Sequence, residues 1–497
     1  MNIYGYENFG YEGNIISVEV DVRKGIPSVD IVGLADGAVK ESRERMRSAI
    51  RNSGFVFPPE RVLISLSPAD LKKEGSCYDL AMALSVLDST GEYGFIEAEV
   101  LVLGELGLSG NVRPVRGVNA AVSSAVEKGI RFVIVPAANV NEVNGFDVKI
   151  VGVETLYQAV DALRNVGFFH RLESEKVKAQ SVEFNDDEDR VEMCNELRLP
   201  KRLVRAIEIA VAGKHNLLVT GRPGCGKTVA INTLVPLLTP KLTVEESQPV
   251  TRIWSLAGLM KPNDELLRTA PFRIPHQTAT IEGICGGGLH CSPGEISLAH
   301  NGILFLDEAA EFRSIVLQML RVPLESKHIT LSRAGRTTVY PANFQLIMAS
   351  NPCPCGNLGS KDRLCLCSAK SVEMYWRKFS APLIDRIGVI LNIDDEDEKV
   401  AVDIGELRNH VIKAFEIQRK KSLYNNSLPV QGLASSFDSE AVKLYEKHFS
   451  ENCLSERKMA NILRVAITIA NMDGRESVSC DDVREAVSFS ENEVMKS

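Results

Sequence analysis

The sequence predicts an α/β protein that ends in a helical domain, and three observations lead to that expectation. Strand-like and helix-like segments alternate in residues 1–165 and again in residues 197–395, which is typical of sheets flanked by helices, with a parallel sheet in the second region. Residues 396–497 show a helical pattern only. Residues 166–196 contain the acidic run 186–189 among polar residues, so we expect a solvated linker there.

The individual elements follow from local patterns. In the N-terminal region, NIISVEVDV, RVLISLS and RFVIVP are β-branched runs bounded by turn residues and predict strands. The segment GAVKESRERMRSAIRNSG predicts a helix that stops at a glycine. In the C-terminal region, DSEAVKLYEKHF, LSERKMANILRVAITIANM and SCDDVREAV each open on a capping residue and predict helices.

The composition argues against several classes of protein. With 57 basic and 65 acidic residues the formal net charge is −8, which excludes a globally basic nucleic-acid coat but not a local basic patch. The N-terminus MNIYGYENFG lacks the features of a secretory signal, and no stretch reaches about 18 apolar residues. Most of the 11 cysteines are isolated, as in reduced cytosolic proteins. We therefore expect a cytoplasmic protein without a membrane span.

A phosphate-binding loop is the strongest functional signal. A buried strand at Leu217–Val219 leads into GRPGCGKT, and an apolar helix follows, which is the G-x-x-x-x-G-K-[ST] pattern in its strand–loop–helix setting. Glycines there let backbone N–H groups face phosphate oxygens, and the helix N-terminus adds its dipole. Lys227 is expected at the β- and γ-phosphates and Thr228 at Mg²⁺. The expected loop contacts to ATP are Gly221, Pro223, Gly224, Cys225, Gly226, Lys227 and Thr228.

Two further strands end in polar residues that suit ATP hydrolysis. Ile303–Leu306 is followed by Asp307 and Glu308, at the carboxyl end of a strand where ligands bind parallel sheets. We expect Asp307 to hold Mg²⁺ and Glu308 to act as general base on the attacking water. The strand in NFQLIMASN ends in Asn351, whose amide could orient that water; a simple turn before proline is the alternative.

Four cysteines cluster directly after Asn351, as two C-x-C pairs separated by nine residues. Four thiolates with this spacing are expected to form a tetrahedral, structural Zn²⁺ site. Four free thiols in a surface loop are the alternative. The cysteines are Cys353, Cys355, Cys365 and Cys367.

Several long motifs resemble the YifB/ComM family of magnesium-chelatase-like AAA+ ATPases. The resemblance covers nearly the whole chain. Its motifs are IPSVDIVGLADGAVKESRERMRSAIRNSGFVFP, SPADLKKEGSCYDLAMAL, PFRIPHQTATIEGICGGG, PGEISLAHNGILFLDEAAEF, LQMLRVPLESKHITLSRAGRTTVYPANFQLI, NPCPCG, SAPLIDRI and LSERKMANILRVA.

This resemblance implies an AAA+ core with an insert in its second helix at about 265–300, a hairpin at about 327–342 and a C-terminal helical lid. It also implies a ring, usually a hexamer, with nucleotide between subunits. On the family pattern Asn351 senses the γ-phosphate, Arg386 is the arginine finger for a neighbouring subunit, and Arg457 is the sensor arginine of the lid. From the residues alone, either arginine could instead form a surface ion pair.

The N-terminal region resembles the C-terminal domain of Lon protease through KKEGSCYDL and GELGLSGNVRPVRGVNAA. The positions of the Lon serine and lysine are occupied here by Cys77 and Ala121. A serine–lysine dyad needs the lysine as base. We therefore expect no peptidase activity, although Ser76 and Lys73 lie close by in the sequence.

Three hypotheses remain for what the ATPase acts on. The ComM branch of the family is linked to DNA branch migration and uptake of transforming DNA, and the hairpin carries three cations that could track phosphates in a ring pore: Lys327, Arg333 and Arg336. The insert adds His276 and His290. A charged hairpin is also a common solvated edge. The alternatives are an ATP-driven remodeller of a protein partner and a scaffold whose assembly ATP controls.

Overall fold

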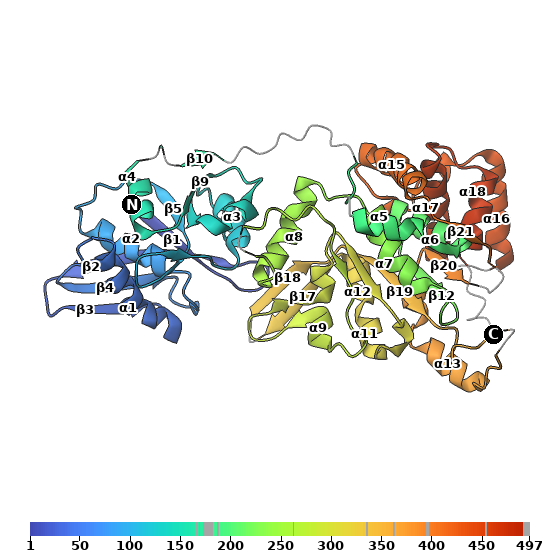
Figure 1. Ribbon diagram of the computed structural model, residues 1–497, viewed down its shortest axis with the longest axis horizontal. Coiled ribbons are helices and arrows are strands. Elements are labelled where there is room, and N and C mark those ends of the chain that lie inside the picture. Colours follow the sequence, from blue (N-terminus) through green and yellow to red (C-terminus); the bar gives the residue numbers. More distant parts are fainter. Residues whose placement is uncertain are drawn as a thin grey trace.

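The computed structural model is an elongated molecule with three parts in a row (Figure 1). It describes residues 1–165, 167, 169–171, 182–185, 188–261, 263–333, 336–360, 363–393, 397–452 and 455–490. The N-terminal domain lies at one end, a C-terminal helical region at the other and an α/β core between them (Figure 1). None of the helices in the described ranges is long and apolar enough to cross a bilayer.

The N-terminal domain is built on a mixed eight-stranded sheet in the order β10-β9-β8-β5-β1-β2-β4-β3. Helices α1, α2 and α4 pack on one face and α3 on the other, so this domain has a core on both sides of its sheet. The strands are β1 (Asn2–Glu7), β2 (Asn14–Arg23), β3 (Ser28–Val32), β4 (Arg61–Ser67), β5 (Glu99–Val102), β8 (Phe132–Pro136), β9 (Lys149–Val153) and β10 (His170–Arg171), with a small β6 (Glu105–Leu106) and β7 (Val112–Arg113) ribbon. The helices are α1 (Gly37–Asn52), α2 (Asp79–Ser89), α3 (Val118–Glu127) and α4 (Leu156–Arg164).

The stretch expected as a linker contains structure at both ends. Strand β10 pairs with β9 and so extends the N-terminal sheet to Arg171. At the other end, α5 (Glu188–Asn195) packs on the core, and Phe184 is buried with the Arg408 guanidinium 4.9 Å from its ring centre. Part of the acidic run, residues 186–187, lies outside the described residues. The apolar residues among the charges therefore anchor this connection.

The core is a five-stranded parallel sheet in the order β13-β16-β19-β12-β20. Helices α6 and α7 cover one face, and α10, α11 and α13 cover the other. The strands are β12 (Leu217–Thr220), β13 (Phe272–Arg273), β16 (Ile303–Leu306), β19 (Gln345–Ser350) and β20 (Val389–Asn392), and β11 (Arg198–Pro200) pairs with β21 (Lys399–Ala401) beside it. The helices are α6 (Lys201–Gly213), α7 (Lys227–Leu238), α8 (Val244–Leu256), α9 (Ile281–Cys285), α10 (Glu295–Leu298), α11 (Ser314–Met319), α12 (Arg321–Ser326), α13 (Ala369–Arg377) and α14 (Ala381–Ile384).

The stretch at 265–300 is not wholly an insert, which corrects the expectation from the sequence. Its strand β13 pairs in parallel with β16 and forms the edge of the core sheet. A two-residue strand next to Pro271 and Pro275 gives no periodic signal, so the pattern concealed it. The hairpin of β14 (Gly286–Gly287) and β15 (Ser292–Pro293) stands outside the sheet, as does the expected hairpin of β17 (His328–Arg333) and β18 (Arg336–Pro341).

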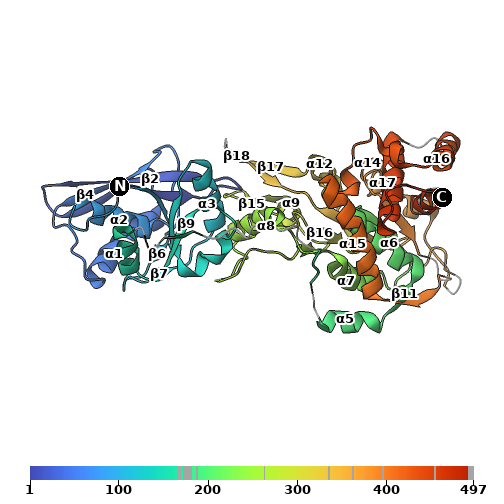
Figure 2. The same ribbon diagram turned by 90° about the horizontal axis from the view of Figure 1, so that it is seen from above.

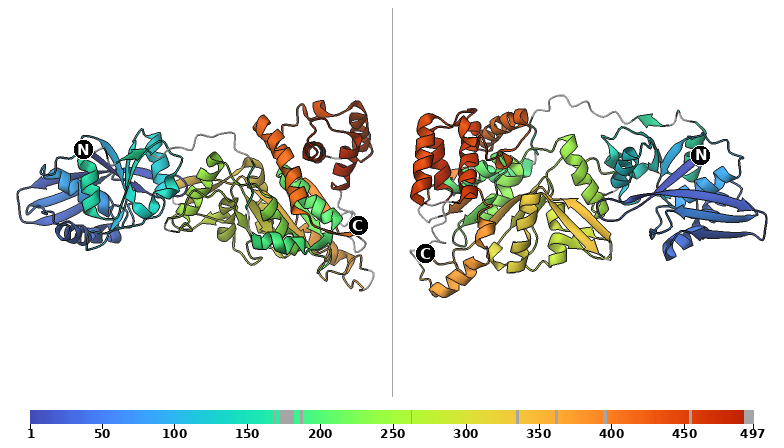
Figure 3. Two further views of the ribbon diagram at one scale, coloured as in Figure 1. Left: turned by 45° about the horizontal axis from the view of Figure 1, so that its top comes forward. Right: turned by 180° about the vertical axis from the view of Figure 1, so that it is seen from behind.

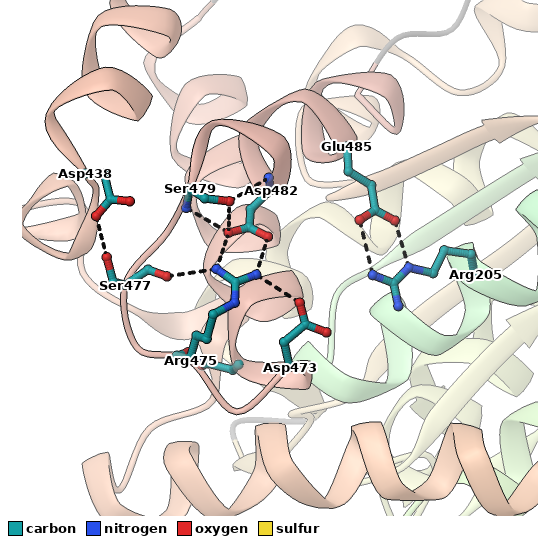
Figure 4. Close-up of polar contacts among 9 residues, drawn as sticks. Arg205, Asp438, Asp473, Arg475, Ser477, Ser479, Asp482 and Glu485 are labelled. Atoms are coloured by element: carbon teal, nitrogen blue, oxygen red, sulfur yellow. Dashed lines mark hydrogen bonds and ion pairs between the residues drawn. The ribbon is translucent and has the colours of Figure 1, made fainter.

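The C-terminal helical region, expected from the resemblance to be a lid, contains α15 (Ile404–Lys421), α16 (Ser439–Asn452), α17 (Glu456–Met472) and α18 (Cys480–Ser488), and the helices predicted from the sequence are present. Its apolar residues are continuous with those of α6 and α7 in one hydrophobic cluster. Figure 4 shows the polar part of this junction, where Arg205 of α6 makes two hydrogen bonds to Glu485 of α18, at 2.7 and 3.1 Å. Within the C-terminal helical region, Arg475 donates two hydrogen bonds to Asp482. The Asp482 carboxylate also accepts from the Ser479 N–H and so completes the capping box of α18 (Figure 4).

The N-terminal domain meets the core at α8 and the two hairpins. Figure 2 labels α8, β15, β17 and β18 on the side of the core that faces this domain, and Figure 3 shows the two parts side by side in two further views. The backbone N–H of Tyr11 donates to Thr338 Oγ1 of β18 at 2.9 Å, and that of Gly10 donates to the carbonyl of His290 at 3.3 Å. The Arg252 guanidinium of α8 also lies over the Tyr11 ring, 4.2 Å from the ring centre. One short loop of the N-terminal domain thus contacts both hairpins.

Candidate active site

The sheet topology brings three strand ends together. Strand β12 lies beside β19, and β19 beside β16, with Thr220 opposite Ser350 and Leu306 opposite Met348. The loops that follow these strands therefore open at one edge of the sheet, where ligands bind α/β folds. A pocket of about 370 Å³ lies there. Its lining residues are Pro223, Gly224, Gly226, Lys227, Thr228, Val229, Asp307, Glu308, Ala349, Ser350 and Asn351.

The phosphate loop has the backbone that its glycines allow. Gly224 and Gly226 have φ of +83° and +93°, which only glycine adopts at little cost, and Gly226 caps α7. The Lys227 ammonium donates to the carbonyls of Gly221 at 2.6 Å and Arg222 at 2.9 Å. Burial lowers the pKa of Lys227. This ammonium is therefore held inside the loop, at the wall of the pocket.

The residues expected to hold Mg²⁺ face each other. Thr228 Oγ1 donates to Asp307 Oδ1 at 3.2 Å, so a hydroxyl from the first turn of α7 and a carboxylate oxygen from the turn after β16 lie side by side. Oxygen donors of this kind, few in number and open to water and phosphate, suit Mg²⁺. The donor set fits the ion that the sequence predicts.

Glu308 and Asn351 complete the pocket. Glu308 is exposed and has φ of +49°, a conformation that non-glycine residues seldom adopt, and its N–H donates to Asp307 Oδ1 at 2.9 Å. Such strained residues cluster at functional sites. Asn351 Oδ1 lies 3.4 Å from Lys227 Nζ. Two residues predicted from separate strands are thus in direct contact.

Arg386 and Arg457 lie apart from this pocket and do not line it. Both pair with one carboxylate: Arg457 Nη2 is 2.6 Å from Glu325 Oε1, and Arg386 Nη2 pairs with Glu325 Oε2. The Arg386 side chain is 12% exposed and that of Arg457 44%. Hydrogen bonding from Arg386, helped by Arg457, lowers the pKa of Glu325. The finger and the lid arginine expected from the resemblance are therefore neighbours.

The three cations of the hairpin have different surroundings. Arg333 is exposed near its tip. Arg336 places its guanidinium 4.8 Å from the centre of the Phe9 ring. Lys327 lies at the base as the left-handed cap of α12, where burial lowers its pKa, with the positive charges of Lys214 and Arg464 adding to the effect.

The two histidines of the predicted insert have different surroundings. His276 is exposed and hydrogen-bonds Thr278 Oγ1 at 2.8 Å. His290 Nδ1 lies 3.3 Å from Glu74 of the N-terminal domain. His290 therefore belongs to the domain interface.

The four clustered cysteines converge in space. All four sulfur atoms lie within 4.8 Å of one another. Cys353 Sγ is 3.4 Å from Cys355 Sγ and 3.7 Å from Cys365 Sγ. These separations are far beyond the length of a disulfide, about 2.05 Å.

One corner of the N-terminal domain, around Cys77 and Lys73, resembles Lon protease in sequence. Among the described residues, neither Cys77 nor Ser76 is hydrogen-bonded to a lysine there. Burial, followed by the charges of Glu7 and Asp79, raises the pKa of the Cys77 thiol. Ala121 is fully buried in α3. The Lys73 ammonium donates to the carbonyls of Pro68 and of Leu71, and Ser76 Oγ donates to Glu105 at 2.5 Å.

Some residues at these sites have no signal in the sequence. Glu325 joins two arginines that lie 61 and 132 positions away along the chain. Ser360 accepts a hydrogen bond from Arg222 of the phosphate loop. Neither residue belongs to a recognisable spacing, because each contact depends on how distant segments fold together.

Comparisons with known proteins match this architecture along most of the chain. Residues 195–401 match the family "Magnesium chelatase, subunit ChlI", residues 18–139 match "Subunit ChlI of Mg-chelatase", and residues 403–490 match "Magnesium chelatase, subunit ChlI C-terminal".

Similar proteins span the same length. An uncharacterized protein of Mycobacterium tuberculosis is 37% identical over 97% of this chain and 96% of its own. The competence protein ComM of Haemophilus influenzae is 34% identical over 98% of this chain and 96% of its own. The uncharacterized protein YifB of Escherichia coli is 36% identical over 95% and 94%. The chain therefore belongs to the YifB/ComM family of magnesium-chelatase-like AAA+ proteins.

Proposed function

We propose that this protein is a ring-forming ATPase that couples ATP hydrolysis to movement on DNA. The observation that supports hydrolysis most is the meeting of Lys227, Thr228, Asp307, Glu308 and Asn351 in one pocket. They come from the phosphate loop and from the ends of β16 and β19, and together they supply the groups that one chain contributes to phosphoryl transfer to water. Binding of nucleotide alone would not need an exposed carboxylate at Glu308.

Within the pocket each side chain has one task. The Lys227 ammonium, which now donates to two neutral carbonyls, would donate to the γ-phosphate, a charged and therefore stronger acceptor. Thr228 and Asp307 would hold Mg²⁺, which neutralises charge on the phosphates when bound. Glu308 would take the proton of the attacking water, and the Asn351 amide would orient that water.

The paired arginines support assembly into a ring, for which we expect a hexamer. Arg386 and Arg457 share Glu325 away from the pocket of their own chain, so in a ring they would meet the nucleotide of a second subunit. A γ-phosphate would then compete with Glu325 for two cations. Arg386→Ala should bind ATP normally and lose hydrolysis by about 10³-fold, as other arginine fingers do. A variant that hydrolyses ATP at the normal rate would contradict this role.

DNA is the substrate that the hairpin supports best. Arg333 is exposed near the tip, and Arg336 lies against Phe9, so a cation and an aromatic ring stand together. Cations that follow phosphates beside rings that stack on bases are the usual means of holding single strands without reading sequence. A relative of similar length bears the name competence protein. Lys327 is half-buried at the base of the hairpin, so we do not assign it to DNA.

The test is ATPase rate at low salt, with and without single-stranded and branched DNA. We expect DNA to raise the rate of the intact chain several-fold, and Arg333→Ala with Arg336→Ala to lose most of that increase while keeping the rate without DNA. Glu308→Gln should bind ATP and assemble but not turn over. A rate that DNA leaves unchanged would contradict the DNA motor and favour a protein substrate or an ATP-gated scaffold.

A further inference from the structure

The loop between β19 and α13 needs something other than an apolar core to hold it. Its described residues contain no helix or strand, and a loop of this length is usually functional. Of its three leucines, Leu364 and Leu366 are 80% and 84% exposed and Leu358 is half-buried. Cys353 alone of the four cysteines is buried, beside the Pro352 carbonyl that accepts from Trp376 Nε1 at 3.0 Å. Hydrophobic packing therefore fixes only the start of the loop.

The sulfur positions match the edges of a metal–thiolate tetrahedron. With Zn–S bonds of about 2.3 Å, a tetrahedral site places its sulfur atoms about 3.8 Å apart. The Sγ–Sγ separations are 3.4, 3.7 and 3.5 Å among Cys353, Cys355 and Cys365, and Cys367 lies within the same group. Four sulfur ligands on one centre favour Zn²⁺ over the oxygen-loving Mg²⁺.

The same loop rests directly on the phosphate loop. Gly356 has φ of +77°, and a β-carbon there would lie 2.8 Å from Cδ and Cγ of the Pro223 ring, so only a glycine lets the two loops approach this closely. Arg222 Nη1 donates to Ser360 Oγ, and Ser360 Oγ also accepts from the N–H of Arg363 at 2.9 Å. Both contacts lie between Cys355 and Cys365, inside the segment that the metal would close.

The loop reaches the nucleotide pocket at a second point, through the chain itself. Asn351 lies two residues before Cys353, and its Oδ1 is 3.4 Å from Lys227 Nζ. The cysteine cluster therefore borders both the residue that would sense the γ-phosphate and the backbone that would cradle it.

We infer that Cys353, Cys355, Cys365 and Cys367 bind one Zn²⁺, and that this centre braces the phosphate loop, so that zinc occupancy sets the affinity for nucleotide. The inference rests on the proposed nucleotide site but not on hydrolysis or on DNA. With zinc, residues 356 and 360 are held against Pro223 and Arg222. Without it the loop keeps only its anchor at Cys353, and the phosphate loop loses its support on that side.

The first experiment measures zinc content and nucleotide affinity of the full-length protein together. Purified protein should contain about one zinc per chain. Removing it with a chelator should weaken binding of a fluorescent ATP analogue at least several-fold, and adding zinc back should restore the affinity. Zinc content near zero after mild purification would overturn the inference, as would unchanged affinity in zinc-free protein.

Three variants separate the brace from general damage. Cys365→Ser should lose zinc and affinity together, and added zinc should not rescue it. Ser360→Ala should keep its zinc but bind nucleotide a few-fold more weakly, because one contact to the phosphate loop is gone. Cys480→Ser, at a half-buried cysteine of α18 outside the cluster, should match the parent in both measurements. If Ser360→Ala and the chelated parent both bind as tightly as the untreated parent, the brace does not exist.

The result is distinguishable from failure of the proposed function. A protein that binds ATP in a zinc-dependent way but does not hydrolyse it would contradict the ATPase and support the brace. A zinc-free protein with normal hydrolysis would support the ATPase and contradict the brace.

Discussion

The nucleotide pocket of the core and the Lon-like corner of the N-terminal domain contain similar ingredients in different settings. Each has a lysine that donates to two backbone carbonyls: Lys227 to Gly221 and Arg222, and Lys73 to Pro68 and Leu71. Each also has a cysteine two to four residues from that lysine, Cys225 and Cys77. These shared residue types alone therefore do not distinguish the two corners.

The difference lies in what surrounds the lysine. Lys227 stands at the mouth of a pocket with a hydroxyl, two carboxylates and an amide from three strand ends. In the N-terminal domain, Cys77 is near the carboxylates of Glu7 and Asp79, which raise the pKa of its thiol further after burial has done so. A thiol becomes a nucleophile beside cations, not beside carboxylates. The open edge of the parallel sheet brings cationic and anionic side chains together around a pocket, whereas the packed corner of the N-terminal domain does not.

The largest effect that we expect is at Lys227. Lys227→Ala should abolish ATP hydrolysis and weaken nucleotide binding severely, because the γ-phosphate loses its only lysine from the loop. Steady-state phosphate release and binding of a fluorescent ATP analogue measure the two effects. The matched control is Lys73→Ala, judged by the same assays after circular dichroism has shown that it folds. If the Lys73 variant also loses hydrolysis, the two corners are coupled and the contrast between them fails.

A second prediction concerns how the N-terminal domain responds to pH. Glu7 accepts from the Tyr78 hydroxyl at 2.5 Å and from the N–H of Glu74 at 2.9 Å, and burial raises its pKa to about 7, with the charges of Glu74 and Asp36 contributing. Because the folded pKa lies above the unfolded value near 4.5, the folded domain binds the proton more tightly. Its free energy of unfolding should therefore fall as pH rises from about 4.5 to 7, by an amount on the order of 3 kcal/mol.

Hydrogen–deuterium exchange of peptides from β4, corrected for intrinsic rates, measures this change within the intact chain. Glu7→Gln should flatten the dependence between pH 5 and 8. A parent whose β4 protection rises with pH over this range would refute the assignment.

The stability of the junction between the core and the C-terminal helices should respond to pH in the opposite direction. His215 is buried, its Nε2 lies 2.7 Å from Thr468 Oγ1 of α17, and burial together with the Arg464 charge lowers its pKa to about 3. A histidine whose folded pKa lies below the unfolded value near 6.5 contributes stability that is lost as pH falls towards 3. Each pH unit below 6.5 should cost the junction about 1.4 kcal/mol.

Protection of α17 peptides between pH 7 and 5 measures this loss, which should amount to about 2 kcal/mol at pH 5. His215→Gln should show a weaker dependence than the parent, since the glutamine carries no titratable proton. If α17 and β4 lose protection at the same end of the pH scale, the two domains do not differ in the way that these buried groups indicate.

The sequence could predict the features that depend on residues close together along the chain. The strand Ile303–Leu306 and the turn into Lys227 and Thr228 are local patterns, and the structure has them where they were expected. The convergence of their ends follows from strand order. By contrast, β13 was hidden between prolines, and nothing in the sequence shows that Lys327, at the base of the expected hairpin, also caps α12. The contact of Arg336 with Phe9 joins segments more than 300 positions apart, and no periodicity encodes it.

The smallest effect that we expect is at Cys77, where the Lon nucleophile would stand. Cys77→Ser should leave ATP hydrolysis within about twofold of the parent and should give no peptidase activity, because the neighbouring lysine position is Ala121, fully buried in α3. Casein and a fluorogenic peptide are suitable substrates, with ATP present throughout. The serine is smaller and more polar than the thiol in this half-buried position, so a modest loss of stability of about 1 kcal/mol is expected. Peptide cleavage by the parent that Cys77→Ser or Lys73→Ala removes would show that this corner has kept a reaction which its charges and burial argue against.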